Sequence, residues 1–362
     1  RDRMTTVDLI EAPVVGLSFG LDLLDSAGAF VADITTDLVG DGSTVARRAD
    51  NTIHGTCQLV IARQLLWGSA RVRPWVEVSA EGETTTRWNL GVYALMTPAR
   101  NAGEVPETFT VTGYDLLSHL NTPYGSTFAA AVSAVPLTLI ATMLTAAGIT
   151  NAIDQTAIGS VLATAMVWPL DEKNTTLAII NELLALIGYG PLWLDRDGRA
   201  RSRPLDADDP TVWAYSADSA TTTVGESRTL TADYWGVPNR WVFVRNGTTA
   251  VPSEGAGIYT VDNLADGPAS QAGRGRIIIK PVWLDAVSQT ALVSQGDAIV
   301  AADKRVVSAV SFAATPNPEH WHNDRVTFTD AALSLVASPF RLVGWSLPLN
   351  GGDMTLELEA TV

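Results

Sequence analysis

The segment Thr112-Gly113-Tyr114-Asp115-Leu116-Leu117 marks the place where strand-like sequence gives way to helix-like sequence. Before it, apolar and polar residues alternate, as in Thr56–Ile61, which is the pattern of half-buried strands. After it, Asp115 is suited to cap a short helix over Leu116–Leu120. We therefore expect a small antiparallel β domain over residues 1–112, followed by a domain of a different kind.

Residues 113–205 predict an α+β domain with two longer helices. Pro136 begins the first helix and Gly148 ends it, because proline suits the first turn and glycine the position after the last. Asn174 is expected to cap the second helix, and the run Asp195-Arg196-Asp197-Gly198-Arg199 is typical of a hairpin turn that closes the domain. The residues of the second helix at helical spacing are Leu177, Ile180, Leu183, Leu184 and Ile187.

Strand-like runs fill both flanking regions. Val39–Ser43 is expected to be a turn and Trp88–Leu95 a single strand. From residue 206 to 362 one helix, over Gln289–Val307, interrupts the strands, and Asn246–Gly275 is rich enough in small and turn residues to predict an exposed loop. The candidate strands of this last region are Arg228–Ala232, Arg240–Arg245, Ile277–Val282, Val306–Phe312, Arg325–Thr329, Pro339–Trp345 and Met354–Ala360.

Composition narrows the class of protein. The chain has 362 residues, 46% hydrophobic and 17% charged, with a formal net charge of −15. This length predicts two to three domains, and the low charged fraction suggests that partners cover part of the surface. The acidic balance argues against a protein that grips nucleic acid, which needs clustered Lys and Arg, although an acidic wall would let DNA slide past.

A membrane span is not expected, although Asn121–Asn151 contains no charged residue. A spanning helix needs about 20 strongly apolar residues. This stretch is interrupted by Ser133, Thr138, Thr142 and Thr145. A buried amphipathic helix over Pro136–Ala147 explains it better.

The segment Glu319-His320-Trp321-His322-Asn323-Asp324 is the best candidate for a metal site. Two histidines at i and i+2 of a strand would point to the same face, but a zinc site needs a third ligand. A polar loop that leads into the strand Arg325–Thr329 explains the segment better. The sequence alone leaves open whether His320 and His322 bind a metal. Asp195 and Asp197 echo part of a calcium loop, but arginines follow where further oxygen ligands are needed.

The sequence signals for catalytic groups are equally weak. The acid pairs Asp171-Glu172 and Asp208-Asp209 are adjacent in sequence, which predicts nothing about the spatial pairing of a glycosidase. Cys57 and His54 lie three residues apart in an expected strand, so they point to opposite faces. The 11 Trp residues suit core and interface packing better than a sugar platform. We predict no catalytic, cofactor-binding or metal-binding residue, no cofactor and no enzyme.

The order of several short motifs resembles that of the tail-hub proteins of long-tailed bacteriophages. That family includes the baseplate hubs of contractile tails and the late-control tail proteins. The likeness covers the chain from about Val14 to the end, and the order and spacing of the motifs carry it. The motifs are Thr112–Leu117, Pro136–Thr138, Asn174–Leu177, Leu192–Gly198, Pro238–Val244, Asn323–Val326, Trp345–Leu349 and Met354–Leu356.

This resemblance implies the fold class α+β, mainly β. Two tube-like β-barrel or sandwich domains, residues 1–112 and 206–362, would flank an inserted α+β domain, residues 113–205. It also implies a homotrimeric ring that closes the tail tube, adapts it to the tip or spike, and leaves a channel for the genome. The protein would lie at the tail tip of the virion after assembly in the host cytoplasm.

The resemblance implies partners as well. These are a distal tail protein or tail tube ring, the tape-measure protein, tip, spike or receptor-binding proteins, and phage DNA that passes through the lumen without specific binding. Two other functions stay open: a receptor- or carbohydrate-binding tail protein, which would expose Trp rings in one groove, and a cell-wall hydrolase component.

Overall fold

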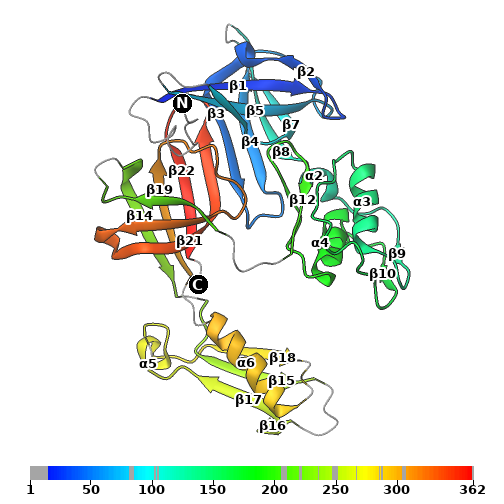
Figure 1. Ribbon diagram of the computed structural model, residues 1–362, viewed down its shortest axis with the longest axis vertical. Coiled ribbons are helices and arrows are strands. Elements are labelled where there is room, and N and C mark those ends of the chain that lie inside the picture. Colours follow the sequence, from blue (N-terminus) through cyan, green and yellow to red (C-terminus); the bar gives the residue numbers. More distant parts are fainter. Residues whose placement is uncertain are drawn as a thin grey trace, which may run out of the picture. The chain divides into compact units, whose positions relative to one another are not determined.

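The computed structural model divides the chain into two compact units (Figure 1). The large unit comprises Arg1–Arg228 and Ser311–Leu358, and the small unit comprises Thr229–Val310 and Glu359–Val362. The residues that the structure describes are 15–80, 85–101, 103, 106–204, 210–219, 222–234, 236–246, 252–265, 267–284, 286, 288–303 and 307–360.

The first β region of the large unit ends with its last strand at Asp115, whereas the expected β domain ended at residue 112. Its strands are β1 (Val15–Leu24), β2 (Phe30–Asp33), β3 (Leu38–Arg48), β4 (Gly55–Ile61), β5 (Arg71–Ala80), β6 (Thr86–Asn89), β7 (Tyr93–Asn101) and β8 (Thr108–Asp115). The expectation of one strand over Trp88–Leu95 is wrong, because the chain breaks at Gly91, which has a φ of 110°. A Cβ at Gly91 would lie 2.8 Å from the Tyr93 hydroxyl, so glycine is required there.

The expected turn over Val39–Ser43 is also wrong. These residues form an irregularity inside β3, since Val39 is opposite Val60 and Thr44 is opposite Gln58. The Ser43 hydroxyl donates to the Val39 carbonyl at 2.6 Å and accepts from the Val60 N–H at 3.0 Å. The side chain thereby replaces hydrogen bonds of the ladder where the extra residues bulge out.

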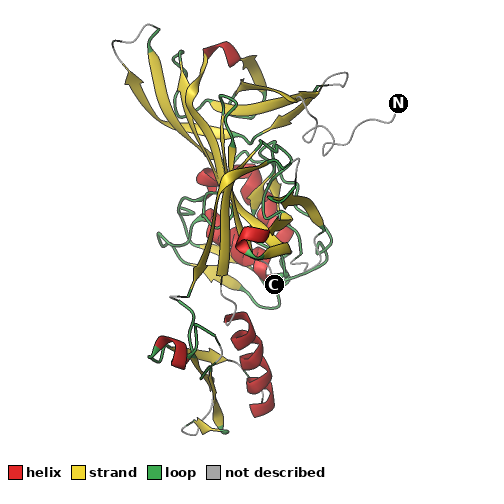
Figure 2. Cartoon of the chain, turned by 90° about the vertical axis from the view of Figure 1, so that its left-hand side faces the viewer, coloured by secondary structure: helices red, strands yellow, loops and turns green. Residues whose placement is uncertain are grey.

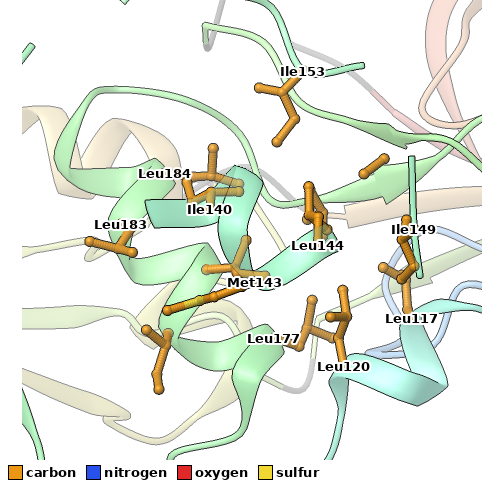
Figure 3. Close-up of a cluster of buried hydrophobic side chains, with 14 of the residues drawn as sticks. Leu117, Leu120, Ile140, Met143, Leu144, Ile149, Ile153, Leu177, Leu183 and Leu184 are labelled. Atoms are coloured by element: carbon orange, nitrogen blue, oxygen red, sulfur yellow. The ribbon is translucent and has the colours of Figure 1, made fainter. Parts of the chain in front are cut away.

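The helical region contains the three predicted helices. They are α2 (Leu117–Leu120), α3 (Pro136–Ala146) and α4 (Thr176–Leu186), joined by β9 (Phe128–Ala130), β10 (Met166–Trp168), β11 (Trp193–Leu194) and β12 (Ala200–Arg201). Figure 3 shows how side chains from α2, α3 and α4 meet in one apolar core, with Leu120, Ile140, Leu144 and Leu184 fully buried. The cap of α4 is Thr175 and not Asn174: the Thr175 hydroxyl accepts from the Ala178 N–H at 3.1 Å.

The large sheet continues with six further strands. They are β13 (Thr211–Ser216), β14 (Val224–Asp233), β19 (Val307–Ala314), β20 (Arg325–Asp330), β21 (Leu335–Pro348) and β22 (Met354–Ala360). The main path runs β14-β19-β22-β21-β3-β4-β8-β7-β5-β1-β2, with β6, β13 and β20 beside it. Within the described residues this path is open and does not close into a barrel. The mainly β class is confirmed, whereas the three domain ranges stay a prediction.

The small unit was predicted only in part. It contains β15 (Arg240–Arg245), β16 (Ser253–Glu254), β17 (Gly257–Asp262), α5 (Gln271–Arg274), β18 (Ile279–Leu284) and α6 (Gln289–Asp303). The helix α6 lies along one face of this sheet (Figure 2) and packs on the buried Trp241 and Phe243. The expected long loop over Asn246–Gly275 is wrong, because β16, β17 and α5 lie within it.

Candidate interaction surfaces

The two candidate metal ligands lie in a turn that leads into β20, as the favoured alternative of a polar loop predicts, and they do not share a strand face. His320 is buried, with Nε2 2.7 Å from the Tyr215 hydroxyl and Nδ1 3.5 Å from an Asp324 carboxylate oxygen. His322 stacks on Trp193 at 5.3 Å instead. The described residues hold no cluster of three His, Cys, Asp or Glu side chains that could bind a metal ion.

The second histidine belongs to a buried aromatic group. The ring of His322, a half-buried residue, lies 4.7 Å from that of the buried His54. Burial, with the nearby charge of Arg47, lowers the pKa of His54 to about 3 and that of His322 to about 2. Both imidazoles are therefore neutral at physiological pH, where they act as packing groups.

Arg47 is the centre of a contact that the sequence did not indicate. Its side chain comes from β3, is 3% exposed, and stands 4.5 Å from the Trp321 ring centroid. Arg196 lies 5.3 Å from the same centroid, so two guanidinium groups flank one indole. The Leu194 carbonyl accepts from Arg47 at 3.1 Å and from the Trp321 indole N–H at 2.9 Å. These contacts fix the β11–β12 hairpin against β3 and the turn before β20.

The hairpin at Asp195–Arg199 is confirmed, and no calcium loop is built there. Gly198 has a φ of 75°, and the Asp195 carboxylate accepts from the N–H groups of Asp197 and Arg199 at 3.0 and 2.9 Å. Its other oxygen accepts from Arg201 at 2.9 Å. Both carboxylate oxygens of Asp195 thus accept hydrogen bonds that stabilise the turn.

Two of the remaining chemical candidates, Cys57 and Asp171, are described by the structure. Cys57 is buried, and burial raises the pKa of its thiol, which disfavours the thiolate. Asp171 accepts from the Lys173 N–H at 2.9 Å in an exposed turn before α4. Asp208-Asp209 lies outside the described residues.

The tryptophans singled out by the sequence do not gather in a groove. Trp75, Trp241 and Trp345 are buried, and Trp67, Trp88 and Trp193 are half-buried. Trp283 is 61% exposed, on β18 of the small unit. Core packing therefore accounts for most of them.

The sheets leave edges and apolar side chains uncovered. The strands β2 and β14 end the main path of the large sheet, and β2 exposes Phe30 and Val31. On β18, at the edge of the small sheet, Ile279 is also exposed. Open edges and exposed apolar groups of this kind are suited to protein partners. Within the described residues, no helix is both long and apolar enough to cross a membrane.

Comparison with known proteins shows which solved structures share this fold. No family model and no curated protein matches the chain. The tail protein of Neisseria meningitidis MC58 is 13% identical, with a TM-score of 0.59 over 94% of this chain and 96% of that one. The 43 kDa tail protein of prophage MuSo2 from Shewanella oneidensis is 10% identical, with a TM-score of 0.60 over 94% and 98%.

A secretion complex provides a third match. A chain of the half-lidded Francisella PdpA–VgrG complex is 7% identical, with a TM-score of 0.57 over 96% of this chain and 58% of that one. The chain thus shares its fold with phage tail proteins and with a chain of a VgrG complex. The resemblance predicted from the order of the motifs is confirmed at the level of the fold.

Proposed function

We propose that this chain is a structural, non-enzymatic hub protein of a phage tail, and that three copies form a ring around a channel. The observation that carries the proposal is the antiparallel pair β21–β3, in which Gly344–Pro348 lies opposite Thr44–Arg48. This pair joins the first and last β regions into one sheet, so each copy brings two β modules side by side. Three such copies would place six modules in a ring.

The ring geometry would adapt a sixfold tail tube to a threefold tip. Six similar modules would match a sixfold tail tube or distal tail ring, while the chain itself repeats three times towards a tip or spike protein. The open strands β2 and β14 would meet neighbouring copies, because ring closure is the way to remove exposed edges. The tape-measure protein and receptor-binding proteins would contact the same assembly at the virion tail tip.

The channel would be acidic. A formal net charge of −15 without a predicted basic cluster favours walls that repel phosphate, so that DNA passes without sticking. A carbohydrate-binding role is less well supported, since Trp75, Trp241 and Trp345 are buried.

The mass of the assembled protein tests the proposal directly. Native mass spectrometry of the purified chain, together with its distal tail partner, should give a species of three 38.4 kDa chains. Cryo-electron microscopy of that species should show a central channel lined by carboxylates. A monomer at every concentration and with every tail partner, or a ring without a pore, would contradict it.

A further inference from the structure

We propose that a polar pocket of the large unit, built around Arg71, binds a small oxyanion such as phosphate or a carboxylate. The pocket has a volume of about 250 Å³. It lies between β5, the turn after β1, the end of α3 and the β11–β12 hairpin. Its charged lining consists of Arg71, Arg73, Arg199 and Asp197. This site is independent of the proposed hub function.

Arg71 is the side chain of the pocket that lacks a close counter-charge. Its side chain belongs to β5, and the residue is 6% exposed. Among the described residues, its guanidinium makes one hydrogen bond, a long one from Nη1 to the Gly148 carbonyl at 3.5 Å, and no carboxylate forms an ion pair with it. A buried charge without a close counter-charge is costly, so an anion in the pocket would relieve it.

Asp25, the acid whose charge acts on Arg71, already has hydrogen-bond partners. Asp25 acts on Arg71 only through its charge. Its Oδ1 accepts from the N–H groups of Ala27 and Ala29 at 2.9 and 2.8 Å, which holds the turn after β1. Asp25 therefore balances part of the field without filling the pocket.

Two glycines keep the guanidinium accessible. A Cβ on Gly28 would lie 3.8 Å from Nη1 of Arg71, and a Cβ on Gly148 would lie 3.6 Å from Nη2. Both glycines have positive φ, 86° and 66°. The turns that carry them therefore approach Arg71 as bare backbone, which leaves room for a ligand beside the nitrogens.

The neighbouring charges leave the pocket positive. Arg73 is paired with Asp22 at 2.8 Å. Arg199 is 3.7 Å from Asp197, whose other oxygen accepts from Asn89. Three arginines against one aspartate line a small cavity in a strongly acidic chain. Arginine binds phosphate and carboxylate through paired, charge-assisted hydrogen bonds, and the volume suits an anion rather than a drug-sized ligand.

Titration calorimetry of the full chain with sodium phosphate and with sodium acetate tests the site, at ionic strength matched with sodium chloride. We expect saturable binding of at least one anion and a higher Tm in its presence. Arg71→Met should weaken binding about tenfold or more, since it removes a charge-assisted contact. The matched control Arg63→Met removes an exposed arginine that pairs with Asp37 and should leave binding unchanged.

A second variant separates loss of anion binding from loss of folding. Arg199→Met changes a side chain that is 51% exposed, and it should weaken binding while circular dichroism stays that of the wild type. Preference for phosphate over acetate would assign a phosphate site, preference for acetate would assign a carboxylate site, and equal binding would assign an unselective oxyanion site. The proposal is overturned if neither anion binds beyond the chloride control, or if Arg71→Met and Arg63→Met behave alike.

Discussion

Arg47 brings a positive charge into the interior of the large unit, and its partners come from distant parts of the chain. Leu194 and Trp321, which hold or cover it, are separated from it by well over a hundred residues. Burial raises the pKa of Asp115 to about 6, and the charge of Arg47 opposes that rise. Arg47→Met should therefore lower the free energy of unfolding by about 3–5 kcal/mol, as expected when one of two buried charges is removed.

Urea denaturation measures this effect. Arg63→Met, at an exposed ion pair, serves as control and should change the free energy of unfolding by less than about 0.5 kcal/mol. The double variant Arg47→Met/Asp115→Asn should recover part of the loss, because the carboxylate left alone is then neutral. Equal stability of Arg47→Met and wild type would show that the cluster around Trp321 does not hold the hairpin.

The neutral pair His54 and His322 makes stability depend on pH. Their pKa values of about 3 and about 2 lie below the ordinary 6.5. Below pH 6.5 the two imidazoles therefore bind protons in the unfolded chain but not in the folded chain. Stability is therefore full above pH 6.5 and falls as the pH is lowered, by up to about 1.4 kcal/mol per pH unit for each ring. Asp115 acts in the opposite sense between its ordinary 3.8 and about 6, where the folded chain binds the extra proton.

Substitutions separate these contributions. His54→Phe should flatten the fall in stability between pH 6.5 and about 4, and Asp115→Asn should steepen it. Thermal unfolding measured across this range gives both slopes. An unchanged slope in His54→Phe would mean that the imidazole is solvated and protonates freely in the folded protein.

At the scale of elements, Thr175 and Asn174 have different roles at the start of α4. Thr175 caps the helix through its hydroxyl, whereas the Asn174 amide donates to the Pro169 carbonyl at 2.7 Å in the preceding turn. Thr175→Ala should cost about 1 kcal/mol of unfolding free energy, which is typical for loss of a cap. Thr175→Ser keeps the hydroxyl and is the matched control. Chemical denaturation that finds no difference between the two variants would contradict this assignment.

The elements predicted correctly are those that local sequence determines. The helices α3 and α4 follow from apolar residues at helical spacing, from Pro136 and from Gly188, which has a φ of 74°. The same local signals failed at Val39–Ser43, because glycine and serine residues predict a turn whether or not the strand continues beyond them. The strand β16 was missed because it has only two residues, and β17 was missed because it depends on packing against α6.

The candidate sites were harder to predict than the fold. Arg47 and Arg71 look like ordinary strand residues in the sequence, and only the fold brings them to Trp321 and Gly148. Conversely, His320 and His322 look like a site in the sequence, but the turn sends them to different neighbours. Sites built from residues far apart in the chain leave no local pattern to read.

At the scale of the whole molecule, ring formation should depend on the open ends of the large sheet. Phe30 and Val31 are 60% and 56% exposed on β2, and Leu23 and Leu24 pair with Ala32 and Phe30, which leaves Val31 as an extra residue in the ladder. Such a bulge weakens unwanted strand addition by solitary chains, so the exposed side chains would contribute to the contact along this edge in the ring.

The double variant Phe30→Lys/Val31→Lys should therefore shift the trimer towards monomers without loss of secondary structure, because charges at a packed interface are costly to desolvate. Native mass spectrometry gives the ratio of the species, and Leu66→Lys is the control, since Leu66 is 80% exposed in the segment between β4 and β5. If the double variant assembles as well as the control, β2 faces solvent in the ring and the contacts between copies must lie elsewhere. If both variants assemble poorly, added positive charge itself opposes assembly and the edge is not responsible.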